Sequence, residues 1–395
     1  MKRVGSILQS AVGSFSEAGY EVQTTRVATP AFPLMSDFRD PDRVVAYAVQ
    51  IEGAAVQNQI DYISIGPALP EYPDSYQVIP EIIKNTERLF VSGLMTSSEG
   101  GICLPCTRSC AQVIHSIAPL EPDGFANLRF AALAWVKPGA PFFPAAYADP
   151  GIGSESISIS IATEAADLAI QSIIGAASLN EARQRLVTSV ETNASRMSAV
   201  VEKLTDQFEC SFSGFDFTLA PFPDRDHSIG SALEALGIPQ VGGAGTLAGV
   251  TFLAEALDHA RFPRSGFNGL MLPVLEDAIL ARSAALGELS VHDLLLYSSV
   301  CGTGLDTIPL PGDISVEALY ALLLDVGMLS HRLAKPLTAR LMPIPDKSAG
   351  DETIFDFPYF ANSRVMNLEG ESLTGLLTGD ETISILDRHA AARSS

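Results

Sequence analysis

The apolar positions of the chain fall into two kinds of segment. Short continuous apolar runs are typical of buried strands, whereas longer stretches with apolar residues every three or four positions are typical of helices with one buried face. We predict strands at 130–136, 215–219, 269–274 and 337–342, while 295–301 fits either a strand or a helix end. The alternation of the two kinds predicts an α/β fold in which helices cover sheets.

Helix starts are marked by side chains or turns that accept hydrogen bonds from free backbone N–H groups. Segments 178–208 and 290–296 each begin with a serine that is followed three residues later by an acidic residue, a capping-box pattern. A third helix at 315–333 follows a Pro-Gly-Asp turn that ends at Asp313. Asp313 is therefore either a helix cap or a candidate functional acid.

The composition is that of a protein with a large core. The chain has 395 residues, of which 47% are hydrophobic and 18% are charged, and this excludes disordered chains and small disulfide-held scaffolds. No internal repeat or long Gly/Ser linker divides it. We therefore expect one continuous α/β domain over residues 1–395.

The charge balance narrows the range of partners. The chain carries 25 basic and 46 acidic residues, a formal charge of −21, and its basic residues form no runs. Nucleic acid and anionic membrane surfaces are therefore poor partners. Every apolar run is interrupted well before the roughly 20 residues that a membrane-spanning helix needs. Because residues 1–6 do not lead into an apolar signal core, we expect a cytoplasmic protein.

The five cysteines are an odd number, and without an export signal we expect reduced thiols and no disulfide. Cys103, Cys106 and Cys110 have the spacing C-x2-C-x3-C, which fits an iron–sulfur or zinc site and also one face of a helix. Three thiols without a nearby histidine favour packing in the core over metal binding.

Two segments, 266–277 (GFNGLMLPVLED) and 300–313 (VCGTGLDTIPLPGD), resemble domain-of-unknown-function family 711, which is often labelled "PFL-like". The resemblance covers roughly residues 20–370 and continues through shorter matches at 216–221, 245–248 and 335–340, and more weakly at 25–27 and 127–130. It implies a pyruvate-formate-lyase-like barrel of two five-stranded halves surrounded by helices, in a family whose activity is largely unassigned. Fold alone does not supply a mechanism.

The glycyl-radical motif of that fold is absent. Enzymes of this type carry a C-terminal Arg-Val-x-Gly segment, whereas this chain has Arg364, Val365, Met366 and Asn367. Asn367 stands where the glycine is required, so we do not expect glycyl-radical chemistry.

An acidic set lies in the two strongest motifs, next to predicted strand ends. Glu276, Asp277 and Asp306 are candidate catalytic acids, and Asp216 and Asp313 are candidate ligand-binding residues. Glu276, Asp306 and Asp313 would suit a hard cation such as Mg²⁺ or Ca²⁺, or an acid/base pair with separated pKa values. The alternative is that these acids cap helices or form structural ion pairs.

A thiol and several cations complete the candidate site. Cys301 and Lys335 are candidate catalytic residues. Cys301 is a nucleophile if Lys335 or Arg340 makes its surroundings electropositive, and a buried packing residue otherwise. Three arginines are candidates for binding an anionic ligand, although they could equally neutralise nearby carboxylates: Arg26, Arg129 and Arg340. The Gly-rich start of a helix at Gly245 and Thr246 is a further candidate.

Three functional hypotheses follow. The first is a divalent-metal or acid/base dependent hydrolase or lyase that acts on a small polar carbonyl-containing metabolite. The second is a non-catalytic protein that binds or senses a small metabolite on a degenerate glycyl-radical-enzyme fold. The third is a thiol-dependent enzyme built on Cys301. All three predict a small-molecule ligand, and the frequency of two-fold assemblies favours a homodimer.

Overall fold

A six-stranded sheet organises the computed structural model, which describes residues 1–35, 37–97, 100–151, 156–368, 370 and 372–388. The strand order is β1-β2-β3-β5-β9-β8. The strands are β1 (Arg26–Ala28), β2 (Tyr62–Ala68), β3 (Leu89–Leu94), β5 (Phe130–Ala134), β8 (Gly304–Pro311) and β9 (Leu337–Ile344).

The strand directions bring several loops to one edge of this sheet. Strands β1, β2, β3 and β5 are parallel to one another, β9 is antiparallel to β5, and β8 is parallel to β9. Because Ala132 pairs with Ala339 across β5 and β9, the end of β5 lies beside the start of β9. The segments that follow β1, β2, β3 and β5 therefore meet the segments that precede β8 and β9.

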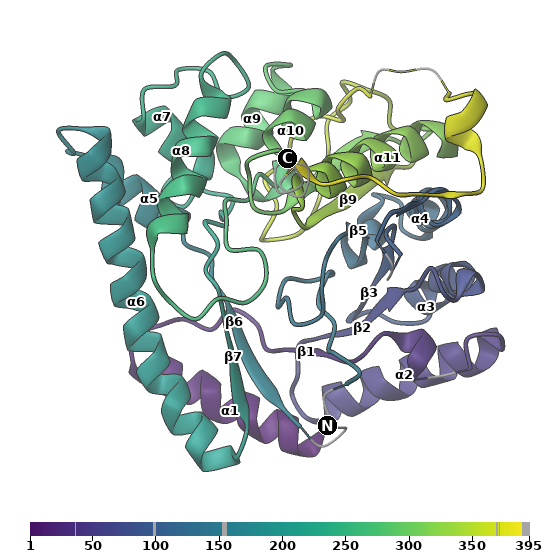
Figure 1. Cartoon of the computed structure of the whole chain (residues 1–395), viewed down its shortest axis with the longest axis horizontal. Coiled ribbons are helices and arrows are strands. Elements are labelled where there is room, and N and C mark those ends of the chain that lie inside the picture. The colour runs from purple at the N-terminus through teal and green to yellow at the C-terminus, as the bar shows by residue number, and fades with distance from the viewer. Residues whose placement is uncertain (36, 98–99, 152–155, 369, 371, 389–395) are drawn as a thin grey trace.

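One face of the sheet is covered by four helices (Figure 1). They are α2 (Pro41–Gln57), α3 (Ile79–Lys84), α4 (Leu104–Ile117) and α11 (Val316–Leu333). Alternate strand residues such as Ile63, Val91 and Ala339 are buried against them. Successive side chains of a strand point to opposite faces, so the residues between these ones point away from the helices.

The other face of the sheet is covered by loops. Residues 135–150 lie across it, and Phe143 packs on Phe90 while Tyr147 packs with the Ala131 and Leu133 side chains. Ser64 fixes this loop by donating to the Ala146 carbonyl at 2.6 Å. Arg340, which follows the helix-facing Ala339, belongs to the loop-covered face.

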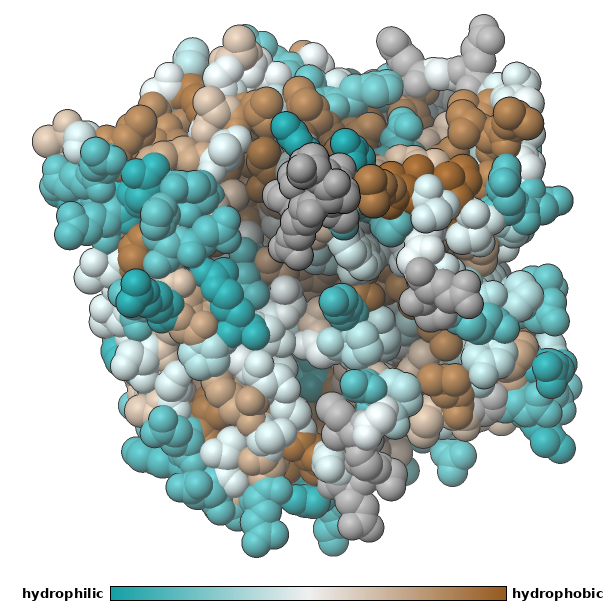
Figure 2. Space-filling model, in the orientation of Figure 1, coloured by the Kyte–Doolittle hydropathy of each residue, from teal (hydrophilic) through white to brown (hydrophobic). Residues whose placement is uncertain are grey.

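A helical half completes the molecule on the left of Figure 1. Helix α1 (Lys2–Glu17) packs on the long α6, and a two-stranded parallel sheet, β6 and β7, runs beside them. Figure 2 shows a surface that is hollowed between the helical half and the sheet. The elements of this half are β6 (Ser158–Ala162), β7 (Ser211–Asp216), α5 (Ala166–Ile173), α6 (Leu179–Phe208), α7 (Ile229–Ala235), α8 (Thr246–His259), α9 (Ala278–Ala285) and α10 (Val291–Tyr297).

The α/β expectation is confirmed, but the barrel is not. Among the described residues the six strands form an open sheet, and beyond β8 only isolated bridges, such as Pro273 with Asp306 and Leu219 with Leu270, lead towards β7. A third sheet pairs β4 (Ile102–Cys103) with β10 (Thr382–Ile383). Short 3₁₀ helices occur at Phe32–Leu34, Pro73–Val78, Ala118–Leu120, Phe125–Arg129, Val274–Glu276 (η5) and Gly375–Thr378 (η6).

The three predicted helices are confirmed, with the predicted caps Ser178 and Ser290, but α11 is capped by Ser315 and not by Asp313. Ser178, Ser290 and Ser315 each accept a hydrogen bond from the backbone N–H three residues ahead, at the starts of α6, α10 and α11. Segment 295–301 contains the end of α10 and no strand. The predicted strand at 269–274 is wrong: it contains only isolated bridges and the start of η5, because Gly269 and Pro273 interrupt a regular ladder.

The expectation of five reduced thiols is wrong at two positions. Cys103 and Cys106 form a disulfide, whereas Cys110, Cys210 and Cys301 are free. Cys103 is the extended N-cap residue of α4 and Cys106 lies in its first turn, so their Cα atoms are 5.2 Å apart, within the range that a disulfide spans. No helix in the described part of the chain is long and apolar enough to cross a bilayer.

Candidate functional site

The centre of the site is one arginine shared by two carboxylates. The Arg340 Nε donates to Asp306 Oδ1 at 2.5 Å, and its Nη2 donates to Glu276 Oε1 at 2.7 Å. Nε and Nη2 lie on the same edge of the guanidinium group, which usually receives both oxygens of one carboxylate. Here the edge receives one oxygen from each of two acids, so the two carboxyl groups lie side by side.

Burial separates the roles of these three residues. The side chains of Asp306 and Arg340 are 0% and 6% exposed, whereas that of Glu276 is 23% exposed. The Oδ2 of Asp306 is buried without a hydrogen-bond partner among the described residues. Asp306 therefore neutralises Arg340 from the interior, and Glu276 is the member that reaches solvent.

The proton affinity of Glu276 follows from this arrangement. Burial raises its pKa to about 7, against the attraction of Arg340, and repulsion from Asp306 and Glu164 adds to the rise. Burial alone would lower the pKa of Arg340, but Asp306 and Glu276 raise it above its ordinary value. Arg340 interacts with two negative charges, and this raises its pKa. Glu276 shares the single positive charge of Arg340 with Asp306, so the attraction to Arg340 does not cancel the effect of burial.

An irregular part of β8 brings Glu276 to this position. The β8–β9 register shifts between Leu305 and Ile308, and Thr307 has a φ of 44°. The turned backbone lets Thr307 Oγ1 accept from the Leu275 N–H at 3.3 Å. This bond, together with the bridge from Pro273 to Asp306, fixes η5 on β8 and places its last residue, Glu276, next to Arg340.

A second arginine lies on the same face of the sheet, in β1. The Arg26 Nε donates to Thr24 Oγ1 at 2.8 Å, and its guanidinium carbon lies 5.4 Å from the Phe143 ring centre and 5.9 Å from that of Tyr62. Within the described ranges its two terminal nitrogens have no hydrogen-bond or ion-pair partner. Burial lowers the pKa of Arg26 and nearby Arg340 contributes, while Glu164 and Glu276 oppose this.

Glu164, which follows β6, lies opposite Arg26 on the side of the helical half. The Gln23 Nε2 donates to both Glu164 oxygens at 3.0 Å. Partial burial of the carboxyl group raises the pKa of Glu164, although the residue as a whole is exposed and does not lie in the core. The electrostatic interactions of Glu164 with Arg26 and Glu276 join all these groups into one charged cluster, defined as Arg26, Glu164, Glu276, Asp306 and Arg340.

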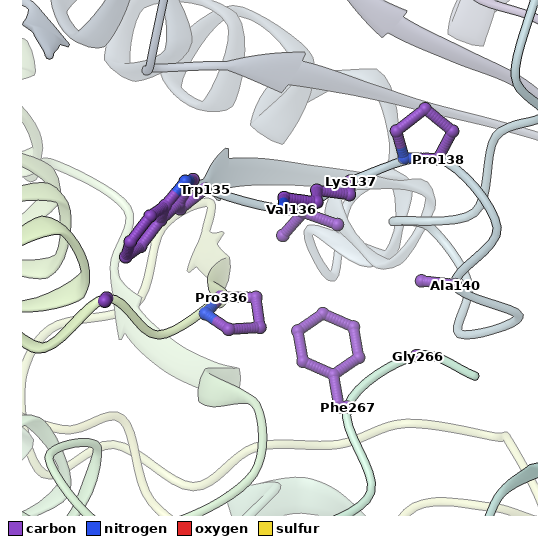
Figure 3. Close-up of a pocket in the computed structure, with 9 residues that line it drawn as sticks. Trp135, Val136, Lys137, Pro138, Ala140, Gly266, Phe267 and Pro336 are labelled. Carbon is purple, nitrogen blue, oxygen red and sulfur yellow. The ribbon is translucent and has the colours of Figure 1, made fainter. Parts of the chain in front are cut away.

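A pocket of about 290 Å³ (Figure 3) is connected to the charged cluster through the Phe142 ring. The Phe267 ring forms part of its wall, and the centres of the Phe267 and Phe142 rings are 5.7 Å apart. The Arg340 guanidinium carbon lies 5.6 Å from the Phe142 ring centre. The only tryptophan of the chain, Trp135, forms another part of the wall. The complete lining is Trp135, Val136, Lys137, Pro138, Ala140, Gly266, Phe267, Ala334 and Pro336.

Several predicted site residues hold the local structure. Asp216 accepts from the Phe267 and Asn268 N–H groups, and so fixes the loop that walls the pocket. Arg129 donates to the Ile83 and Thr86 carbonyls at the end of α3. Both side chains are thereby bound to backbone groups of the protein itself.

Other predicted residues lie apart from the charged cluster. Asp313 is exposed in the turn after β8, seven residues beyond Asp306, which corresponds to about 20 Å of extended strand. Among the described residues no group of three or more His, Cys, Asp or Glu side chains is placed to hold a metal ion, so the Glu276, Asp306 and Asp313 set is not assembled. Gly245 caps α8, and the Thr246 hydroxyl accepts from the Gly242 N–H at 3.0 Å.

Cys301 and Lys335 are near each other but outside the charged cluster. The Cys301 thiol is buried, and the Lys335 Nζ donates to the Ser298 carbonyl at 2.9 Å. Burial lowers the pKa of Lys335, against the effect of Cys301. Lys335 lies between the pocket residues Ala334 and Pro336 in the chain, yet its amine is bound to a backbone carbonyl at the end of α10.

Asp277 provides a testable structural role. It is fully buried, accepts from Ser228 and from backbone N–H groups at the starts of α7 and α9, and thereby caps two helices. We expect Asp277→Ala to lower the free energy of unfolding by about 3 kcal/mol, because several buried donors lose their acceptor. Urea unfolding measures this, and exposed Asp313→Ala is the matched control, with a change under about 0.5 kcal/mol. Equal effects of the two variants would contradict the assignment.

Comparison with known proteins places the chain among sequences without an assigned activity. A family model described as "Uncharacterised ACR (DUF711)" matches residues 1–362. A "UPF0210 protein" of Pyrobaculum arsenaticum is 28% identical over 354 residues, which is 85% of this chain and 76% of the relative. Others of the same name occur in Oenococcus oeni, 25% identical over 89% of this chain and 81% of the relative, and in Syntrophobacter fumaroxidans, 27% identical over 85% and 77%.

Proposed function

The chain belongs to the uncharacterised DUF711 family, and from this premise we propose that it is an acid/base enzyme, a hydrolase or lyase acting on a small metabolite with a carboxylate and a reactive carbonyl group. The observation that carries the proposal is Glu276: it is the only one of the three residues in the Arg340 ion-pair group with substantial solvent contact. A carboxyl group that reaches solvent from such surroundings can exchange a proton with a bound molecule.

Glu276 has the properties of a general acid or base. Its pKa of about 7 lets it hold or release a proton near neutral pH, which is where acid/base catalysis is most efficient. Asp306 and Arg340 position it: Asp306 supplies a second negative charge that favours the protonated form, and Arg340 fixes one oxygen and leaves Oε2 for the reacting group. Perturbed groups of this kind are concentrated at functional sites.

Arg26 would hold the substrate carboxylate. Its guanidinium is fixed by Thr24, Tyr62 and Phe143, so little side-chain entropy is lost when a ligand binds. Two terminal nitrogens without protein partners in the described ranges match the two oxygens of a carboxylate. Since Arg26 and Glu276 interact electrostatically, a small substrate could contact both.

A ligand screen with turnover analysis tests this proposal. Small mono-, di- and 2-oxocarboxylates are screened by Trp135 fluorescence and thermal shift, and each mixture is then analysed by mass spectrometry. We expect Arg26→Met to weaken binding of a hit at least tenfold, because a buried charge-assisted pair is lost, whereas the exposed control Arg43→Met binds normally.

The outcomes separate the hypotheses. Conversion of the hit by the wild-type protein supports an enzyme, and an unchanged hit that still needs Arg26 supports a protein that only binds its ligand. Binding that is equal in Arg26→Met and the wild type would reject the charged cluster as the ligand site. Loss of conversion in Cys301→Ser, with conversion kept in Glu276→Gln, would favour the thiol mechanism instead.

A further inference from the structure

The disulfide lies where a dithiol is chemically reactive. Cys103 is the N-cap of the 14-residue helix α4, and its Sγ accepts from the Cys106 N–H at 3.3 Å. A helix N-terminus and a backbone N–H donor both stabilise a thiolate at this position. A thiolate stabilised in this way is also a good leaving group in disulfide exchange.

The short loop argues against a purely structural role for the disulfide. Cys103 and Cys106 are only three positions apart, and the stabilisation from restricting the unfolded chain grows with the length of the closed loop. The same residues are already held by α4 and by strand β4. This disulfide is therefore among the least stabilising that the chain could form.

A C-terminal segment covers the disulfide. Residues 375–388, here called the cover, run beside α4 and α11 as the yellow segment of Figure 1. Thr382 in β10 pairs with Cys103, and the Glu381 carbonyl accepts from the Leu104 N–H at 3.1 Å. Cys103 and Cys106 are consequently only 8% and 3% exposed.

Polar contacts hold much of the cover in place. The Arg108 guanidinium donates to the Thr378 carbonyl at 2.8 Å and pairs with Asp380 at 3.2 Å, and the Tyr320 hydroxyl donates to the Leu377 carbonyl at 2.6 Å. The apolar side chains of Leu376, Leu377 and Leu386 remain exposed. A segment with few buried apolar contacts and exposed hydrogen bonds opens locally at a small fraction of the global unfolding free energy.

We propose that Cys103 and Cys106 are a redox-active pair that exchanges with a dithiol reductant when the cover opens. A thiolate of the reductant attacks one sulfur, the protein S–S bond breaks, and a mixed disulfide forms. The second thiol of the reductant then displaces the remaining cysteine. Two electrons and two protons pass to the protein, which gains two thiols, and the reductant becomes a disulfide.

The pair is connected to the pocket wall by a short path. The Cys103 N–H donates to the Met95 carbonyl at 2.9 Å, and the next residue, Thr96, accepts at Oγ1 from the backbone N–H of Trp135 at 3.2 Å. The fluorescence of the only tryptophan is therefore a suitable reporter of reduction, alongside direct counting of thiols.

The test measures the reduction rate in the folded full-length chain. Dithiothreitol is added, samples are alkylated over time, and mass spectrometry identifies the modified cysteines. We expect Tyr320→Phe, which removes only the hydroxyl that binds the Leu377 carbonyl, to accelerate the reduction about fivefold, the effect of one lost hydrogen bond on local opening. Arg108→Ala should accelerate it further.

Controls make the result decisive. Arg282→Ala removes a surface ion pair with Glu234, far along the chain from the cover, and should leave the rate unchanged. Three outcomes would overturn the proposal: alkylation of Cys103 and Cys106 without any reductant, a wild-type rate equal to that of the urea-unfolded chain, or rates in Tyr320→Phe and Arg108→Ala equal to the wild-type rate.

Discussion

Replacing Arg340 with methionine is expected to lower the free energy of unfolding by about 4 kcal/mol, the typical effect of removing one partner from a buried ion pair. The variant leaves Asp306 in the core with no compensating charge, and Asp306 already has one oxygen without a partner among the described residues. Glu276 also loses the only ion pair that it forms with another described residue. Urea unfolding at pH 7 measures the change.

A double variant tests whether the loss comes from the uncompensated carboxylate. Asp306→Asn removes the charge, so Asp306→Asn/Arg340→Met is expected to recover at least half of the stability lost in Arg340→Met. The surface control is Arg282→Met, whose partner Glu234 is partly exposed, with an expected loss under about 1 kcal/mol. A double variant no more stable than the single one would show that the loss comes from packing and not from charge.

Glu276→Gln is expected to abolish turnover of any substrate that the wild-type protein converts, with a loss of roughly 10²- to 10⁴-fold. Glutamine keeps the shape of the side chain but cannot hold or release the proton. Steady-state kinetics should show a fall in kcat with KM little changed, because the amide oxygen still accepts from Arg340. A variant that keeps its kcat would remove Glu276 from the mechanism.

The same substitution changes the pH dependence of stability. Because burial raises the pKa of Glu276 from about 4.5 to about 7, the folded protein holds a proton that the unfolded chain has released between these pH values. Its stabilising contribution is complete below about pH 4.5 and is lost as the pH rises through 7, by roughly 3 kcal/mol in total. Glu276→Gln should therefore gain stability relative to the wild type as the pH increases. The exposed control Glu352→Gln should show no such trend.

The residues at the centre of the charged cluster could be predicted from the sequence. Glu276, Asp306 and Arg340 lie in the segments that resemble the family, and Arg26 lies in a weaker one. Their proximity could not be predicted, because it depends on the bridge between Pro273 and Asp306 and on the register of β8 with β9. Strand β8 itself gave no clear signal, since it contains glycine, aspartate and two prolines, which are rare in strands.

One part of the site that could not be predicted from the sequence lies in a loop. Glu164 has no motif around it, and its position depends on the pairing of β6 with β7 and on Gln23, which is 141 residues away in the chain. The disulfide was missed for a different reason: an odd number of cysteines describes the whole chain and does not exclude one local pair. The N-cap geometry of Cys103 was the deciding factor, and it is visible only in the structure.

The sheet order also determines how a newly synthesised chain can complete this protein. Strand β9 lies between β5 and β8, although both of those precede it in the sequence. During synthesis on the ribosome, β8 consequently cannot pair with the sheet until β9 has emerged. Asp306, which lies in β8, has no Arg340 to neutralise it until then. Fragments that end before residue 340 should therefore remain incompletely folded, with an acidic edge exposed to chaperones and proteases.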